Sequence, residues 1–221
     1  MVSKNLSLEH KVLAPVKKHE KPPLLLVLHG YGSDENDLFS MAPMLNQQFL
    51  VVSARAPLSI GFGGFAWYEI NFSNDGVKTS NTSQAKEAME MVRKFIVEVH
   101  EAYGTDSEQV SLLGFSQGAI LSYGLSFNYP KEFNSIIALS GYIMADLLPK
   151  QYDLAAVRAL AIFASHGVQD EVIPIDWARK AAAFLEKMKC DFSFKEYAMG
   201  HGVNQNCFED LQRWLSKQQV I

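Results

Sequence analysis

A serine that could act as a nucleophile lies within residues 114–118, which read Gly-Phe-Ser-Gln-Gly. The apolar run Val110–Leu113 precedes it, and a plausible helix, Gln117–Phe127, follows. The G-x-S-x-G motif requires this strand–turn–helix context, because a serine at the tip of so tight a turn tolerates only small neighbours. The pattern predicts acyl-transfer chemistry with Ser116 as the nucleophile.

A serine hydroxyl needs a base to remove its proton, and the chain has six histidines. His201 has a glycine on each side and falls between the last predicted strand and the last predicted helix, where its loop can bend over the sheet. His166 ends another predicted strand and stays open as an alternative. His29 precedes the serine, whereas the base of this fold follows it. The others fall before the sheet or on the polar end of a helix: His10, His19 and His100. We predict His201 as the base.

The acid that orients the base should fall between the serine and the histidine in chain order. Asp170 does so, in a short loop after the predicted strand Leu160–Ala164. Glu171 is adjacent, but neighbouring side chains diverge, and Asp176 is interpreted as the cap of the helix that contains Trp177. The sequence therefore favours Asp170 as the acid.

The negative oxygen of an acyl-transfer intermediate needs two pre-aimed hydrogen-bond donors. In this arrangement one donor is the backbone N–H after the nucleophile, here that of Gln117. The second comes from a loop after an early strand, here residues 29–32, and we predict the backbone N–H of Tyr31. A plain glycine turn is the alternative interpretation of this loop.

Short apolar runs and amphipathic segments must position these residues. Five runs are continuously hydrophobic, as expected of strands buried on both faces of a parallel sheet: Leu24–Leu28, Phe49–Val52, Val110–Leu113, Ile136–Leu139 and Leu160–Ala164. Phe192–Tyr197 and Leu6–Leu13 alternate more and are predicted nearer the edges, the latter as an antiparallel strand. Helices are predicted over four segments: Gln84–His100, Gln117–Phe127, Trp177–Met188 and Val203–Lys217. This alternation implies an α/β fold with a mostly parallel central sheet and helices on both faces.

Length and charge restrict the class of protein. The 221 residues carry a formal net charge of −4 and fit a single domain, residues 1–221, and this charge argues against nucleic acid as a partner. The first residues lack the apolar stretch of a signal peptide, and no run is long enough to cross a bilayer. The two cysteines, Cys190 and Cys207, form no metal-binding pair. We expect a cytoplasmic protein with reduced cysteines, no metal, no cofactor and no integral membrane association.

The stretch Pro57–Ser80 does not fit the alternation of strands and helices. A loop of this length in a compact domain is usually functional or disordered, and its aromatic residues argue against disorder. Three of them are predicted to wall a substrate pocket: Phe62, Phe65 and Trp67. Leu147 and Leu148 are predicted to add apolar surface. The alternative is that the aromatic side chains tether the loop to the core.

Several segments together resemble the phospholipase/carboxylesterase family, small α/β-hydrolases that include acyl-protein thioesterases. They run in family order over roughly residues 24–215: Leu28–Gly32, Trp67–Ile70, residues 114–118, Leu139–Tyr142, His166–Asp170 and Gly200–Gly202. The resemblance implies an α/β-hydrolase fold and a Ser116, Asp170 and His201 triad. It also implies Tyr31 and Gln117 as oxyanion donors and Trp67 beside the acyl pocket. Tyr31 stands where many relatives carry leucine, and Tyr68-Glu69 replaces a common Phe-Asp pair, so substrate preference is the least transferable property.

The expected activity is that of a serine carboxylesterase or thioesterase that works through an acyl-enzyme. The expected partner is a small-molecule or lipid acyl ester or thioester, with an acylated protein as one candidate, and a homodimer is left open. The alternatives are a lysophospholipase, a lactone- or peptide-hydrolysing enzyme, and a ligand-binding protein that kept the fold without turnover.

Overall fold

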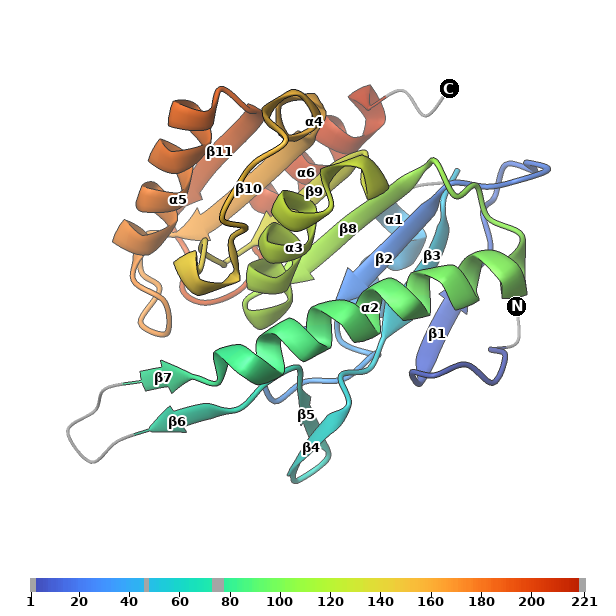
Figure 1. The fold of residues 1–221 in the computed structure, drawn as a ribbon, viewed down its shortest axis with the longest axis horizontal. Coiled ribbons are helices and arrows are strands. Elements are labelled where there is room, and N and C mark those ends of the chain that lie inside the picture. The colour runs from blue at the N-terminus through green and yellow to red at the C-terminus, as the bar shows by residue number, and fades with distance from the viewer. Residues whose placement is uncertain (1–2, 46–47, 73–77, 219–221) are drawn as a thin grey trace.

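Strand β2 (Leu24–Leu28) lies inside a seven-stranded sheet whose strand order is β1-β3-β2-β8-β9-β10-β11 (Figure 1). The structure is a computed structural model that describes residues 3–45, 48–72 and 78–218. The other strands of this sheet are β1 (His10–Leu13), β3 (Leu50–Ala54), β8 (Val110–Phe115), β9 (Ser135–Leu139), β10 (Ala161–Gly167) and β11 (Asp191–Tyr197). Only β1 pairs in the antiparallel direction, with β3, and the other neighbours in this sheet are parallel.

The continuous apolar runs coincide with the buried strands, which confirms that prediction. Every residue of β2, β3 and β9 is buried, as a sheet covered on both faces requires. The edge strand β11 is mostly exposed or half-buried, in agreement with its alternating sequence. Parallel strands place their carboxyl ends at one edge, so the loops after β2, β8, β9, β10 and β11 gather there.

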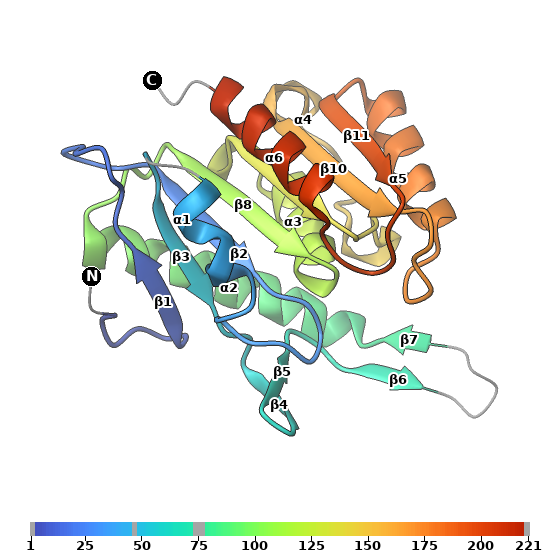
Figure 2. The ribbon, with the colours of Figure 1, turned by 180° about the vertical axis from the view of Figure 1, so that it is seen from behind.

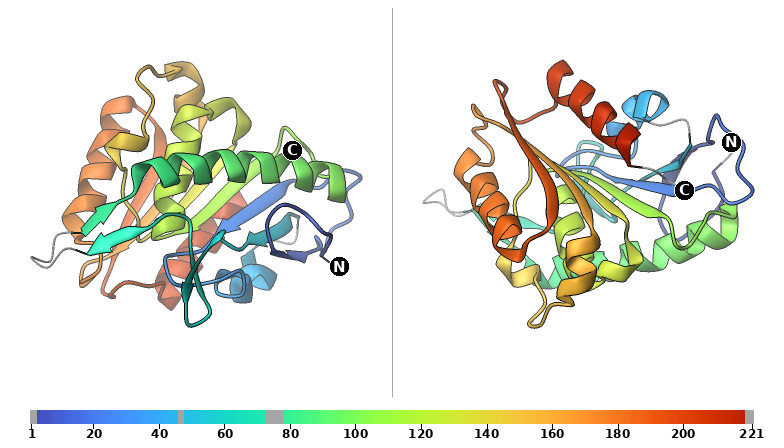
Figure 3. Two further views of the ribbon diagram at one scale, coloured as in Figure 1. Left: turned by 60° about the horizontal axis from the view of Figure 1, so that its bottom comes forward. Right: turned by 90° about the horizontal axis from the view of Figure 1, so that it is seen from above.

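Helices cover both faces of the sheet, and their packing divides the core into two clusters (Figures 2 and 3). Helices α2 (Thr82–Tyr103), α3 (Gln117–Asn128), α4 (Leu154–Ala159) and α5 (Ile175–Met188) contribute to one cluster. Helices α1 (Ala42–Leu45) and α6 (Gln205–Lys217) contribute to the other. Within β2, Leu24, Leu26 and Leu28 face the first cluster, whereas Leu25 and Val27 face the second.

Polar caps set two of the helix boundaries. The Asn81 side chain accepts from the Gln84 N–H at the start of α2, and that of Asn204 does the same for Cys207 at the start of α6. The prediction that Asp176 caps α5 is wrong, because α5 starts earlier, after Pro174, and has no side-chain cap.

The stretch predicted as a long loop contains two short hairpins instead. One pairs β4 (Leu58–Gly61) with β5 (Gly64–Ala66), and the other pairs β6 (Ile70–Phe72) with β7 (Lys78–Ser80). The first hairpin also contacts the loop after β2, through an isolated bridge between Ser33 and Phe65. Residues 73–77 lie outside the described residues.

Candidate active site

Ser116 forms the turn between β8 and α3, with φ 53° and ψ −113°, a conformation that costs a residue with a side chain on the order of 1–3 kcal/mol. Close backbone approach explains the glycines on either side. A Cβ on Gly118 would lie 2.1 Å from the Leu28 carbonyl oxygen. A Cβ on Gly114 would lie 2.4 Å from the carbonyl carbon and oxygen of Gly118. Only glycine at both positions lets α3 pack this closely on β2 and β8, which fixes Ser116 above the sheet.

Three side chains from separate loops form one hydrogen-bonded row at this edge of the sheet. The His201 Nε2 lies 3.0 Å from the Ser116 Oγ, and its Nδ1 lies 2.7 Å from the Asp170 Oδ2. The Asp170 carboxylate can only accept, so the ring proton belongs on Nδ1 and the Nε2 lone pair faces the serine hydroxyl. This is the protonation state that a general base for Ser116 needs.

The Asp170 carboxylate is held rigidly within its own loop after β10. Its side chain is fully buried, and its Oδ1 accepts the backbone N–H groups of Val172 at 2.9 Å and Ile173 at 2.8 Å. Glu171 is exposed, so the neighbouring carboxylate does not take this place. The structure thus brings Asp170, and not Glu171, to His201.

The loop that carries His201 is fixed from two sides. A Cβ on Gly167 would lie 2.2 Å from the Met199 carbonyl oxygen, so the end of β10 and the histidine loop are in backbone contact. The Ser140 hydroxyl donates to the Gly202 carbonyl oxygen at 3.2 Å. Ser140 is fully buried and has a positive φ of 50°. Ser140 falls within the segment Leu139–Tyr142 of the family resemblance, but nothing in the sequence places it against residue 202.

The two predicted oxyanion donors lie on segments that adjoin Ser116. Gln117 is the first residue of α3, and its side chain bridges to another segment: Oε1 accepts from the Trp67 N–H at 2.8 Å, and Nε2 donates to the Tyr68 carbonyl at 2.7 Å. The loop that contains Tyr31 passes so close that a Cβ on Gly30 would lie 3.3 Å from the Ser116 Cβ. Both segments are therefore immobilised next to the serine.

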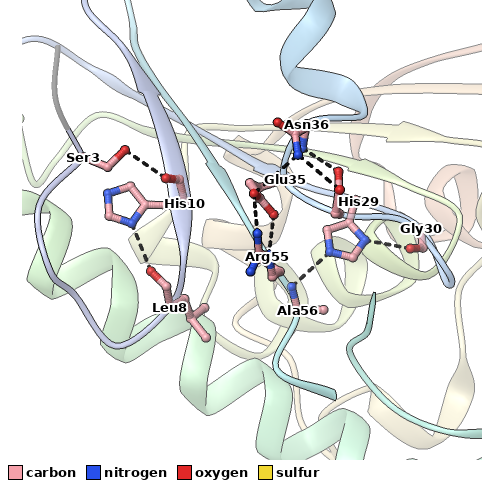
Figure 4. Close-up of polar contacts among 10 residues, drawn as sticks. Ser3, Leu8, His10, His29, Gly30, Glu35, Asn36, Arg55 and Ala56 are labelled. Atoms are coloured by element: carbon pink, nitrogen blue, oxygen red, sulfur yellow. Dashed lines mark hydrogen bonds and ion pairs between the residues drawn. The ribbon is translucent and has the colours of Figure 1, made fainter. Parts of the chain in front are cut away.

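His29 anchors the start of that loop (Figure 4). Its Nε2 accepts from the Ala56 N–H at 3.0 Å, so the ring proton is on Nδ1, which donates to the Gly30 carbonyl at 2.7 Å. The indole N–H of Trp67 donates to the His29 carbonyl at 3.0 Å. Burial lowers the pKa of His29, which is fully inaccessible to solvent, so the ring is neutral in the folded protein.

Because His29 is buried, the free energy of unfolding should depend on pH. The folded state holds the pKa of His29 below its ordinary value of 6.5, so the unfolded chain binds more protons as the pH falls through that value. The free energy of unfolding should therefore decrease from about pH 7.5 to about pH 5.5, by at most about 1.4 kcal/mol per pH unit for one histidine. Urea unfolding at both pH values measures this.

The matched variants are His29→Gln, which keeps an acceptor for Ala56, and His100→Gln, since burial also lowers the pKa of His100. Each variant should remove part of the pH dependence of stability. A His29→Gln protein with the full wild-type dependence would contradict the assignment.

An ion pair between Glu35 and Arg55 holds the other end of the loop after β2. The Glu35 carboxylate accepts from the Arg55 Nε at 2.5 Å and from its Nη2 at 2.6 Å (Figure 4). This hydrogen bond from the guanidinium lowers the pKa of Glu35. The guanidinium also lies 4.7 Å from the centre of the Phe65 ring, on the first hairpin.

The three aromatic residues predicted as a pocket wall do not come together as one. Phe62 is fully exposed at the tip of the β4–β5 hairpin, where φ is 51° and glycines on both sides form the turn. Trp67 is 1% exposed and its indole is used to hold the His29 carbonyl, so it tethers the stretch to the core. Phe65 is half-buried against Arg55. Trp67 thus acts as a tether in this structure, and a role of the three residues in substrate binding stays a prediction.

Two hollows lie among the loops at the carboxyl ends of the strands, and His201 lines the first of them. One, of about 320 Å³, is lined by His201 and Phe115 together with apolar Leu38, Met41 and Val203. The other is an apolar groove of about 470 Å³ after β9, lined by Tyr142, Ile143, Leu148, Trp177 and Phe184 among others. Leu148 thus lines this groove, whereas Leu147 is buried in the core.

Two sequence features pointed partly to the groove. The segment Leu139–Tyr142 was already part of the family resemblance, but Trp177 was interpreted only as part of a helix, although 43% of its surface is exposed. Its ring packs edge-on against Tyr142, with ring centres 4.7 Å apart.

Within the described part of the chain, no three or more His, Cys, Asp or Glu side chains are grouped so that they could hold a metal ion. Both cysteines are free; Cys207 is buried and Cys190 half-buried. No helix among residues 3–45, 48–72 and 78–218 combines the length and hydrophobicity needed to span a bilayer.

A mostly parallel sheet covered by helices, with a serine on a strained turn between a strand and a helix, defines the α/β-hydrolase class. Residues 9–219 match the model of the Phospholipase/Carboxylesterase family. The chain belongs to this family, and it is a serine hydrolase that acts on esters. The resemblance found in the sequence is thereby confirmed.

Similar proteins agree with this assignment. The chain is 31% identical over 217 residues to acyl-protein thioesterase 1 of Saccharomyces cerevisiae, covering 87% of this chain and 91% of that protein. It is 28% identical over 213 residues to the same-named protein of Kluyveromyces lactis, covering 88% and 91%. The solved carboxylesterase of Bacillus cereus has the same fold, with a TM-score of 0.81 at 18% identity over 96% of this chain and 95% of that one.

Proposed function

We propose that this protein hydrolyses acyl esters and acyl thioesters with Ser116 as nucleophile, His201 as base and Asp170 as the acid that orients it. The observation that carries the proposal is the hydrogen-bonded row in which His201 lies 3.0 Å from the serine hydroxyl and 2.7 Å from the carboxylate. The strained turn at Ser116 supports the same role, because such a turn presents the hydroxyl at the carboxyl end of the sheet.

In the proposed reaction, His201 Nε2 takes the Ser116 proton as the oxygen attacks the carbonyl carbon. Backbone N–H groups of Gln117 and Tyr31 stabilise the negative oxygen of the intermediate. His201 then donates its new proton to the leaving alcohol or thiol, and the acyl group stays on Ser116. A water molecule, deprotonated by His201, hydrolyses this ester and restores the serine.

In this proposal the leaving group and the acyl chain of the substrate each occupy one of the two hollows. The leaving group must lie within hydrogen-bond reach of His201 Nε2, so we place it at the hollow that His201 and Phe115 line. We place the acyl chain in the groove of Tyr142, Leu148 and Trp177, whose surface is mostly apolar. The acyl-protein thioesterases among the relatives favour acylated proteins as one substrate class. A cytoplasmic location and a homodimer stay predictions.

A series of p-nitrophenyl esters from acetate to dodecanoate, with the matching acyl thioesters, tests this proposal. Each methylene buried in the groove contributes about 0.8 kcal/mol, so kcat/KM should rise up to roughly fourfold per methylene until the groove is full. Trp177→Ala should flatten the rise for long chains and leave acetate turnover unchanged. Val97→Ala, which removes an exposed apolar side chain from α2, is the control and should behave as wild type.

Lactones and peptides carrying the same acyl groups separate the rival hydrolase activities. Faster turnover of a peptide or lactone than of the esters and thioesters would refute the proposed substrate class. A length series unchanged by Trp177→Ala would place the acyl chain elsewhere.

A further inference from the structure

We infer that His166 is a positioning residue for the Asp170 carboxylate, so that two histidines, and not one, act on the proposed acid. The inference rests on the proposed function and extends it to a residue outside the row of three. His166 lies near the end of β10, and its side chain is fully buried. Its Nε2 is 2.8 Å from the Ile173 carbonyl oxygen and 3.2 Å from the Asp170 Oδ2.

The protonation of His166 follows from these partners. A carbonyl oxygen can only accept, so the nitrogen that faces Ile173 must carry the ring proton. The same nitrogen lies 3.2 Å from the Asp170 Oδ2, a close electrostatic contact beside its hydrogen bond to Ile173, while the backbone N–H of Ile173 donates to the Asp170 Oδ1. His166 thus closes a ring of contacts around the acid loop, and both oxygens of the carboxylate are fixed.

The Asp170 carboxylate accepts three hydrogen bonds and has one further close contact. Its Oδ1 accepts two backbone N–H groups, whereas its Oδ2 accepts from His201 and lies 3.2 Å from the His166 Nε2. Without His166, the Oδ2 would be held only by the imidazole that it is meant to orient. The contact with His166 keeps this oxygen in one position while His201 moves between the serine and the leaving group.

The other nitrogen of His166 makes no contact that would explain the choice of histidine at this position. Its Nδ1 is buried and has no hydrogen-bond partner, one of two such side-chain atoms among the described residues. An unpaired polar atom in the interior costs free energy that an apolar side chain of similar shape would avoid. The contacts that the ring does make are through Nε2, which holds the Ile173 carbonyl and lies beside the acid.

Two isosteric substitutions test the inference. The amide nitrogen of glutamine can reach the place of an imidazole Nε2, whereas that of asparagine is too short and matches Nδ1. His166→Gln should keep kcat within about threefold of wild type, and His166→Asn should lower kcat by about 10- to 100-fold, the loss typical when the partner that orients a working group is removed. KM for the ester should stay unchanged in both. If His166→Asn does not fold, His166→Met replaces it, with the same expected loss.

A double-mutant cycle with Asp170→Asn separates positioning from a general structural effect. His166→Asn should lower kcat much less in the Asp170→Asn protein than in the wild type, because its effect passes through the carboxylate. The downfield proton resonance of the His201 Nδ1–H should persist in His166→Gln and be lost or broadened in His166→Asn.

The inference is overturned if a folded His166→Asn variant has the wild-type kcat, or if its loss is equally large in the Asp170→Asn background. Ser116→Ala is measured in parallel. A Ser116→Ala protein with ordinary turnover would show instead that the proposed function is wrong, so the two failures are distinguishable.

Discussion

A folded Ser116→Ala variant should turn over acyl esters about 10⁴- to 10⁶-fold more slowly than the wild type, as in other serine hydrolases that lose their nucleophile. The loss should fall on kcat, because the hydroxyl forms the bond to the carbonyl carbon and the surfaces that bind substrate are untouched. The fold should persist, since alanine at this position keeps the backbone of the turn and removes only one oxygen. Initial rates with a saturating p-nitrophenyl ester measure the effect.

The control for this experiment is Ser107→Ala, which removes an exposed hydroxyl from the loop before β8, at the other end of that strand from Ser116. A fluorophosphonate probe should label the wild type and Ser107→Ala but not Ser116→Ala. If the wild-type protein is not labelled and shows no turnover of any acyl substrate, the result would favour the alternative interpretation, a ligand-binding protein on the same fold. Normal turnover by Ser116→Ala would show that Ser116 is not the nucleophile.

Asp170→Asn should lower kcat by about 10⁴-fold while the protein stays folded, by analogy with the same change in other triads. The amide oxygen can still accept the N–H groups of Val172 and Ile173, so the loop keeps its two backbone contacts. The amide NH₂ then faces His201, whose Nδ1 must become the acceptor. The ring proton moves to Nε2, and the ring can no longer remove the serine proton.

Glu171→Gln is the matched control, because it makes the same chemical change at the adjacent, exposed carboxylate. It should leave kcat unchanged. Thermal unfolding of both variants checks that the difference in rate is not a difference in folding. If the two substitutions lowered kcat equally, the assignment of Asp170 as the orienting acid would fail.

The sheet could be predicted from the sequence because its strands are buried on both faces. Burial of this kind leaves runs such as Leu24–Leu28 with no polar residue, and a continuous apolar run bounded by polar segments is a signal that does not depend on distant parts of the chain. The order of Ser116, Asp170 and His201 was equally accessible, because it follows from the loops that a parallel sheet brings to one edge. The single-domain organisation of residues 1–221 stays a prediction.

The direction in which the aromatic side chains point could not be predicted. Phe62 and Trp67 stand five positions apart in one glycine-rich stretch, yet one is fully exposed and the other is 1% exposed. Their difference depends on the hairpin turn at Phe62 and on the hydrogen bond from Trp67 to the His29 carbonyl, which joins segments far apart in the chain. The contact of Ser140 with Gly202 was hidden for the same reason, since it crosses 62 positions of the sequence.

The burial of α3 has a consequence for how this enzyme would lose activity on heating. Every residue from Gln117 to Phe127 is buried, so this helix can separate from its surroundings only when the whole domain opens. The loops that carry Asp170 and His201 follow β10 and β11, the last two strands at one side of the sheet, and β11 is largely solvent-exposed. Fraying from that side would detach His201 and Asp170, the proposed base and acid, while Ser116 stayed in place, and activity would be lost reversibly at temperatures below cooperative melting.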